Sequence, residues 1–160
     1  MPKIEIRNAT PADVPTILAL VKALAAFERE PDAVKASEAD LLRDGFGPER
    51  RFEVRLAFID GRAAGFALFF PNYSTWEGRA GLYVEDIFIE EWARSSGLGR
   101  RLIADLAAIA LERGWSRLCL SVLDWNPARG FYEKLGLAHQ REWLPYRVEG
   151  KGLRMLAEQR

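Results

Sequence analysis

One stretch of this chain, residues 83 to 106, constrains the fold more than any other. Its first residues, 83–89, are apolar and aromatic except for two adjacent carboxylates, Glu85 and Asp86. Such groups are rarely buried without a partner, so they suggest a functional role. Residues 94–100 then bring two glycines, and an amphipathic helical pattern follows. Free N–H groups and the positive end of the helix dipole would meet in this loop, and we expect it to bind an anion.

The rest of the chain predicts a single mixed α/β sheet with helices. The Asp60-Gly61 dipeptide is a strong signal for a tight hairpin turn between two strands. The tail, residues 138–157, is predicted to form two further strands that turn near Glu149 and Gly150. Hydrophobic periodicity and turn residues place the other elements, which are strands at 3–7, 51–59, 63–70, 79–90 and 116–122 and helices at 11–28, from 37, from 98 and at 127–135.

Composition excludes several classes of protein. The 160 residues fit one domain, which we place at 1–160, and 23 basic against 23 acidic residues give a formal net charge of zero. Nucleic acid is therefore an unexpected partner. Neither a membrane span nor a secretory leader is recognisable, so we expect a cytoplasmic protein with no membrane partner. The single cysteine, Cys119, lies in an apolar strand and is predicted to be inert.

The loop at 94–99, Arg-Ser-Ser-Gly-Leu-Gly, fits the Arg/Gln-x-x-Gly-x-Gly/Ala pattern that holds the acetyl-CoA pyrophosphate in the GNAT N-acetyltransferase superfamily. Further stretches resemble the diamine (spermidine/spermine) and thialysine N-acetyltransferase branch of that superfamily, and they occur in the same order: 73–79, 82–87, 122–126 and 131–132. The likeness covers nearly the whole chain.

This resemblance implies the α/β (α+β) GNAT fold, in which about four helices flank a mixed, mostly antiparallel central sheet of about seven strands. It also implies acetyl-CoA as the co-substrate, a small-molecule amine as the acceptor, a homodimer, and no metal ion.

Acetyl transfer to an amine needs a base, because freeing a primary amine of its proton at pH 7 costs roughly 4.6 kcal/mol. By resemblance, Glu85 accepts this proton through a water and Tyr132 returns a proton to the departing thiolate. Successive strand residues point to opposite faces, so Glu85 and Asp86 can share one role only if a bulge intervenes. From the residues alone, Glu85 could also be an exposed strand residue, and Phe131-Tyr132 a core aromatic pair.

The resemblance distributes acetyl-CoA over several segments of the chain. Backbone groups of Ile87, Phe88 and Ile89 bond the pantetheine like an added strand, with help from Asn126. The segment from Asn126 to Tyr132 is one residue shorter than in the family pattern. The pyrophosphate is assigned to the loop and its flanking charges, which are Arg94, Ser95, Ser96, Gly97, Leu98, Gly99 and Arg100, and Lys134 is assigned to the adenosine phosphate.

The acceptor is less tightly specified. In the spermidine/spermine branch an acidic residue precedes the tail tryptophan by two positions; aligned on Trp143, that position is Arg141. This change argues against a long polycation and favours a small amine or a lysine-like amino acid. The acceptor-site candidates are the carboxylates and aromatic residues of the resembling stretches, namely Tyr73, Trp76, Glu85, Asp86, Asp124, Trp125 and Trp143. The single histidine, His139, lies outside them and is predicted to be a surface residue.

Three other readings stay open at this point. A dinucleotide-binding fold would need a third glycine where Leu102 stands, so this match is weak. A sensor that binds acetyl-CoA without turnover would lack the base or the acid, and both Glu85 and Tyr132 are present. A peptide or protein N-acetyltransferase would need an open groove, which the sequence does not decide.

Overall fold

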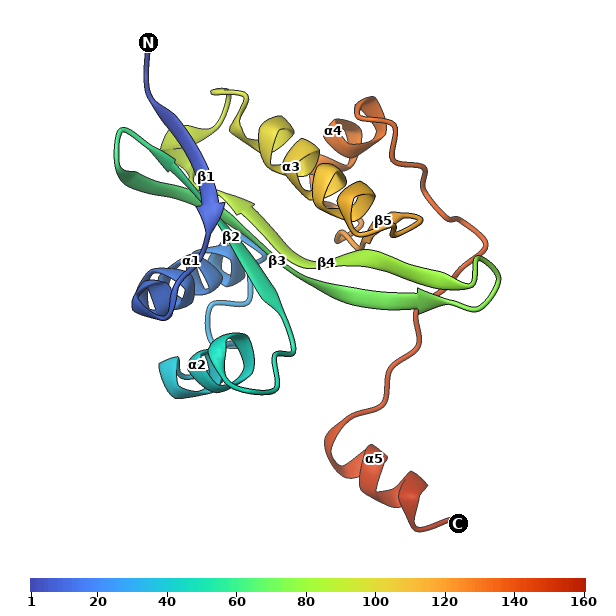
Figure 1. Cartoon of the computed structure of the whole chain (residues 1–160). Helices are drawn as coiled ribbons and strands as arrows, with labels where there is room; N and C mark the ends of the chain where they lie inside the picture. Colours follow the sequence, from blue (N-terminus) through green and yellow to red (C-terminus); the bar gives the residue numbers. More distant parts are fainter. The chain divides into compact units, whose positions relative to one another are not determined.

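The computed structural model describes residues 1–160, and its contacts divide the chain into two compact units, Met1–Leu123 and Asp124–Arg160. The first unit contains one five-stranded sheet in the order β1-β2-β3-β4-β5 (Figure 1). Strands β1 to β4 pair antiparallel, and β5 pairs parallel with β4. The strands are β1 (Ile4–Asn8), β2 (Glu53–Ile59), β3 (Arg62–Ser74), β4 (Arg79–Ile89) and β5 (Leu118–Leu120).

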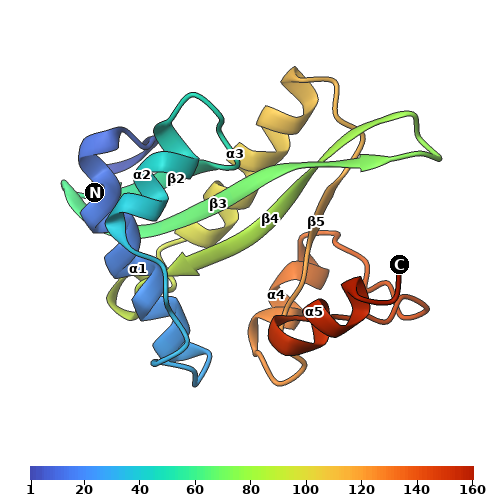
Figure 2. The ribbon, with the colours of Figure 1, turned by 90° about the horizontal axis from the view of Figure 1, so that it is seen from below.

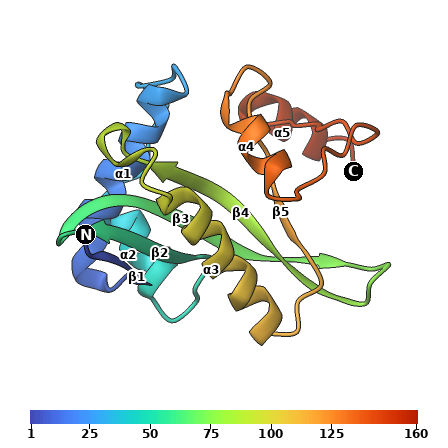
Figure 3. The same cartoon turned by 90° about the horizontal axis from the view of Figure 1, so that it is seen from above.

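Helices cover both faces of this sheet (Figures 2 and 3). On one face, α1 (Val14–Phe27) and α2 (Glu38–Phe46) bury apolar side chains such as Ile17 and Leu41 against Phe66 and Phe88. On the other face, α3 (Leu98–Glu112) packs Leu102 and Leu106 against Leu82 and Val84. Two short 3-10 helices, η1 (Pro11–Asp13) and η2 (Glu91–Ala93), lead into α1 and toward α3.

Local sequence explains several boundaries of these elements. Asp60 and Gly61 have φ angles of 50° and 79°, the pair of positive values that a tight β2–β3 turn requires, so the predicted hairpin is confirmed. Helix α2 begins with a capping box, in which the Asp40 N–H donates to the Ser37 hydroxyl and the Ser37 N–H donates to the Asp40 carboxylate.

The second unit contains α4 (Ala128–Lys134) and α5 (Gly150–Ala157). The prediction of two strands in the tail is wrong, since residues 138–149 contain no strand and α5 follows them. The sheet therefore has five strands instead of about seven, and a fifth helix is present. The residues of α5 favour a helix, because six of the eight are strong helix formers, none is β-branched, and both glycines lie in the first turn.

Candidate active site

A β-bulge at Glu85 interrupts the pairing of β4 with β3. Asp86 lies opposite Leu68 and Val84 lies opposite the next residue, Phe69, so Glu85 has no partner on β3. The side-chain alternation shifts there by one position. Val84 packs on the α3 side of the sheet, whereas Phe88 packs on the α1 and α2 side. Glu85 and Asp86 therefore share the α1 and α2 face, which an unbroken strand would forbid.

The other edge of β4 opens at the same place. Parallel pairing with β5 joins residues 82–84 to residues 118–120 and ends at Val84. Farther along, the Glu90 N–H donates to the Ala64 carbonyl of β3 at 2.8 Å. Since antiparallel hydrogen-bonded pairs alternate, the backbone groups of Ile87 and Ile89 point away from β3, toward the edge that β5 leaves unpaired. This edge can accept an extended, amide-containing ligand in place of a strand.

The loop before α3 is shaped for an anion. Ser95 and Gly97 have φ angles of 66° and 81°, and only glycine adopts such values without strain. The Ser96 hydroxyl donates to the Ala93 carbonyl at 2.6 Å and accepts from the Leu98 N–H at 3.3 Å, which fixes the turn. The first helical bond of α3 is donated by the Arg101 N–H, so the N–H groups of Gly99 and Arg100 have no partner within the helix. These donors, together with the dipole of a 15-residue helix, can hold an anion.

Arg94 begins this loop, but its side chain lies over aromatic rings. Its guanidinium carbon is 4.7 Å from the centre of the Phe27 ring and 5.7 Å from that of Phe88. Its Nε donates to the Ile89 carbonyl at 3.2 Å. The side chain of Arg100 is exposed on the first turn of α3.

The electrostatics of the carboxylates are unusual. Burial raises the pKa of Asp86 to about 6, and the neighbouring charges of Glu85 and Glu28 add to this effect. Burial also raises the pKa of Glu28. Glu28 follows the last residue of α1, Phe27, whose ring centre is 6.3 Å from that of Phe88. Three carboxylates thus gather on the α1 and α2 face of the sheet.

Glu28 was not among the residues that the sequence singled out. One signal was available, because an acidic residue at the C-terminal end of a helix opposes the helix dipole. A charge placed against a local preference often marks a functional position.

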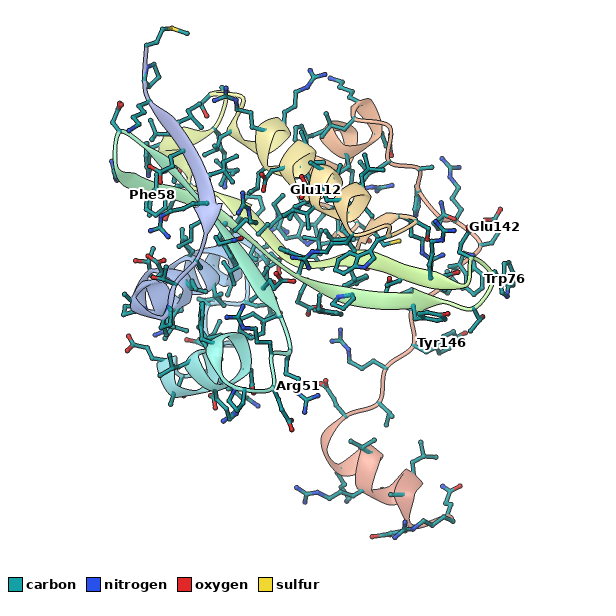
Figure 4. The ribbon with its side chains drawn as sticks, in the orientation of Figure 1. Arg51, Phe58, Trp76, Glu112, Glu142 and Tyr146 are labelled. Atoms are coloured by element: carbon teal, nitrogen blue, oxygen red, sulfur yellow. The ribbon has the colours of Figure 1, made fainter.

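The aromatic candidates Tyr73 and Trp76 were singled out by the sequence but lie away from the carboxylates. They are exposed at the β3–β4 turn, where Figure 4 labels Trp76, and Tyr73 pairs with Ala80, roughly 17 Å along β4 from Glu85. The structure does not bring them to the carboxylates.

The second unit carries the remaining candidates. Tyr132 is half-buried on α4, with its ring centre 5.4 Å from that of Phe131. The Asn126 side-chain oxygen Oδ1 accepts from the Ala128 N–H at 2.8 Å, which forms a local turn just before α4. Asp124, Trp125 and Trp143 are exposed, as is Lys134 in the last turn of α4. The base and acid candidates thus belong to different units of the chain.

Some features are absent from the whole chain. No group of three His, Cys, Asp or Glu side chains is placed to hold a metal ion. No helix has the length and apolar character needed to cross a bilayer. The unpaired edge of β4 and the loop before α3 fit the class of proteins that bind an extended ligand carrying both amide and phosphate groups.

Comparison with known proteins identifies the family within this class. The profile of the Acetyltransferase (GNAT) family matches residues 17–137. A thialysine N-epsilon-acetyltransferase of Bos taurus is 37% identical over 166 residues, which cover 96% of this chain and 97% of the relative. An L-ornithine N5-acetyltransferase of Arabidopsis thaliana is 30% identical, covering 94% of this chain and 86% of the relative. A solved integron cassette protein of V. cholerae superposes with a TM-score of 0.81 at 28% identity, covering 97% and 98% of the two chains.

The chain therefore belongs to the GNAT family of acetyltransferases. It is an acetyl-CoA-dependent N-acetyltransferase related to the thialysine and polyamine acetyltransferases.

Proposed function

We propose that this enzyme acetylates the terminal amine of a small basic amino acid or a similar small amine. The observation that carries the proposal is the group of three carboxylates, Glu28, Asp86 and Glu85, on one face of the sheet beside the opened edge of β4. A protonated amine is attracted to such a group before it loses its proton. The two relatives described above support this choice, since both of their names place the acetyl group on a side-chain nitrogen of a basic amino acid.

Acetyl-CoA fits the residues that are present. The backbone groups of Ile87 and Ile89 would bond the pantetheine amides, and the N–H groups of Gly99 and Arg100, which have no partner within α3, would hold the pyrophosphate. When bound, acetyl-CoA supplies an activated acetyl thioester. We also assign Asn126 to the pantetheine and Lys134 to the adenosine phosphate, as the family pattern implies.

In the proposed reaction, Glu85 accepts a proton from the ammonium group of the acceptor through a water. The freed nitrogen lone pair attacks the acetyl carbonyl carbon, so an N–C bond forms and the C–S bond breaks. Tyr132 then donates its phenolic proton to the departing thiolate. A phenol of pKa about 10 is a weaker acid than a thiol of pKa about 8.5, so this transfer is coupled to the breaking of the C–S bond. The second amine proton returns the phenol to its starting state through solvent, and Glu85 releases the first proton to solvent, which is the one proton that the overall reaction liberates.

The proposal also covers the domain organisation and the oligomeric state of the enzyme. The family match runs from residue 17 to residue 137 and so crosses the boundary between the two compact units, which supports a single functional domain. We further propose that the enzyme is a homodimer. Exposed apolar side chains of the second unit, including Trp143, Leu153 and Leu156, offer material for such an interface.

The test is release of the CoA thiol from acetyl-CoA with thialysine, lysine, ornithine, putrescine, spermidine and a basic peptide. We expect rapid release with the basic amino acids, with kcat reduced by about 100-fold or more in Glu85→Gln and in Tyr132→Phe. Preference for the peptide would replace the small-molecule proposal by a protein acetyltransferase. Absence of release with every acceptor, despite CoA binding, would favour an acetyl-CoA sensor.

A further inference from the structure

The side chain of Arg94 touches three parts of the site at once. Its guanidinium lies 4.7 Å from the Phe27 ring at the end of α1 and 5.7 Å from the Phe88 ring on β4. Its Nε donates to the carbonyl of Ile89 at the end of β4. One side chain thus connects the anion loop, the last turn of α1 and the opened strand.

These contacts suit an arginine. A planar guanidinium can stack on an aromatic face while it donates hydrogen bonds in its own plane, whereas a lysine ammonium is a compact, strongly hydrated charge without such a plane. Phe27 packs on Phe88, and the charge of the next residue, Glu28, lies near enough to Asp86 to raise the pKa of that carboxyl.

We propose that Arg94 is a positioning residue that holds the last turn of α1 against β4, so that Glu28 stays beside Asp86 at the acceptor side of the site. This inference rests on the proposed function for the meaning of the acceptor side. It differs from the phosphate-binding role that a loop arginine would be given from its place in the sequence. By occupying the Ile89 carbonyl, Arg94 also leaves the pantetheine three backbone groups on this edge, the N–H and C=O of Ile87 and the N–H of Ile89.

The first test separates the two substrates. In Arg94→Gln we expect the KM for the amine to rise about tenfold, the effect of losing about 1.4 kcal/mol of interaction, while the Kd for CoA measured by calorimetry changes less than about threefold. Arg94→Lys keeps the charge and should show the same loss for the amine. The control is Arg62→Gln, which removes another exposed arginine that lies over an aromatic ring, that of Trp92 at 4.1 Å, and should change neither constant. A tenfold rise in the Kd for CoA with an unchanged KM for the amine would identify Arg94 as a phosphate ligand and overturn the proposal.

The second test does not depend on the acceptor. Urea unfolding of Arg94→Gln, Phe27→Leu and the double variant forms a double-mutant cycle. We expect the two changes to be coupled. The folding equilibrium constant of the double variant should be at least about twofold larger than the product of the two single effects predicts. Strict additivity would show that the contact holds nothing in place and would overturn the inference. If the cycle shows coupling but no amine is acetylated, the proposed function fails while the bracing contact stands.

Discussion

Asp86 places a charge where its surroundings oppose it. Burial, with the charges of Glu85 and Glu28, raises its pKa to about 6, above the value of about 3.9 expected in the unfolded chain. The folded state therefore binds this proton more tightly. The resulting stabilisation is complete below about pH 4 and is lost as the pH rises through about 6.

Replacing this carboxylate by a neutral amide, in Asp86→Asn, should thus stabilise the protein at high pH. We expect a gain of about 3 kcal/mol in the free energy of unfolding at about pH 8, shrinking toward about pH 4. Urea unfolding at the two pH values measures it. An equal effect at both pH values would mean that the charge of Asp86 is not the cause.

Glu28 is a candidate acceptor-site residue that the sequence did not single out. If it attracts the protonated acceptor, Glu28→Gln should raise the KM for the amine about tenfold, the usual effect of removing one charge-assisted contact, and leave the Kd for CoA unchanged. Glu30→Gln, two residues farther along in an exposed position, is the matched control. Equal kinetics of the two variants would remove Glu28 from the acceptor site.

Among the elements, β3 and β4 depend on a close approach at Gly65. A Cβ atom at this position would lie 2.5 Å from the Phe88 carbonyl oxygen and 2.7 Å from Cδ1 of Ile89. Gly65→Ala should therefore push β4 aside and cost about 1 to 3 kcal/mol of stability. The same displacement should weaken binding of CoA, because it moves the strand edge proposed to hold the pantetheine. Calorimetry and urea unfolding measure the two effects.

The same substitution elsewhere gives the control. Gly130 lies inside α4, and a Cβ atom there would meet nothing within 4 Å. Gly130→Ala should be neutral or stabilising by up to about 1 kcal/mol, as alanine is the better helix former. If Gly65→Ala were equally harmless, the packing of β3 on β4 would be looser than the structure shows.

The predictability of these elements follows the range of the interactions that make them. The Asp60-Gly61 turn and the start of a helix at residue 37 depend on neighbouring residues, so the sequence predicted them correctly. The adjacent carboxylates Glu85 and Asp86 indicated a bulge, because only a bulge lets both serve one face. The prediction of two strands in the tail was wrong. A short apolar run fits a strand and a helix equally well, and the helix propensity of residues 150–157 decided between them. Glu28 was missed because its importance comes from β4, which lies far away in the sequence.

On the scale of the whole molecule, the two units differ in how much of their chain is buried. The first unit contains every buried residue of the chain, and no residue from 124 to 160 is buried. Helix α5 has only eight residues and exposes Leu153, Met155 and Leu156, so it is too short to be stable by itself.

Hydrogen exchange should reflect this division. We expect the amides of β3 and β4 to exchange slowest and those of α5 fastest when the protein is dilute. If the proposed homodimer covers the tail, protection of α5 should increase with protein concentration, together with a change in sedimentation from one chain of 18.1 kDa to two. Protection of α5 that does not vary with concentration, in a sedimenting monomer, would contradict the dimer.

The bulge at Glu85 also adds one residue to β4, so the alternation of side chains between the two faces is out of phase before and after it. The residues of β4 that face α3 are separated by two positions up to Val84, then by three, and by two again from Ile87. A systematic substitution survey should therefore find that charged residues are tolerated at alternate positions of β4, and that the tolerant positions change from odd to even numbers, or the reverse, at the bulge. Deleting any single residue between Val84 and Ile87 would bring the two halves into register and restore an ordinary strand. The enzyme would gain a more regular sheet and lose the one irregularity that brings two carboxylates to the same side.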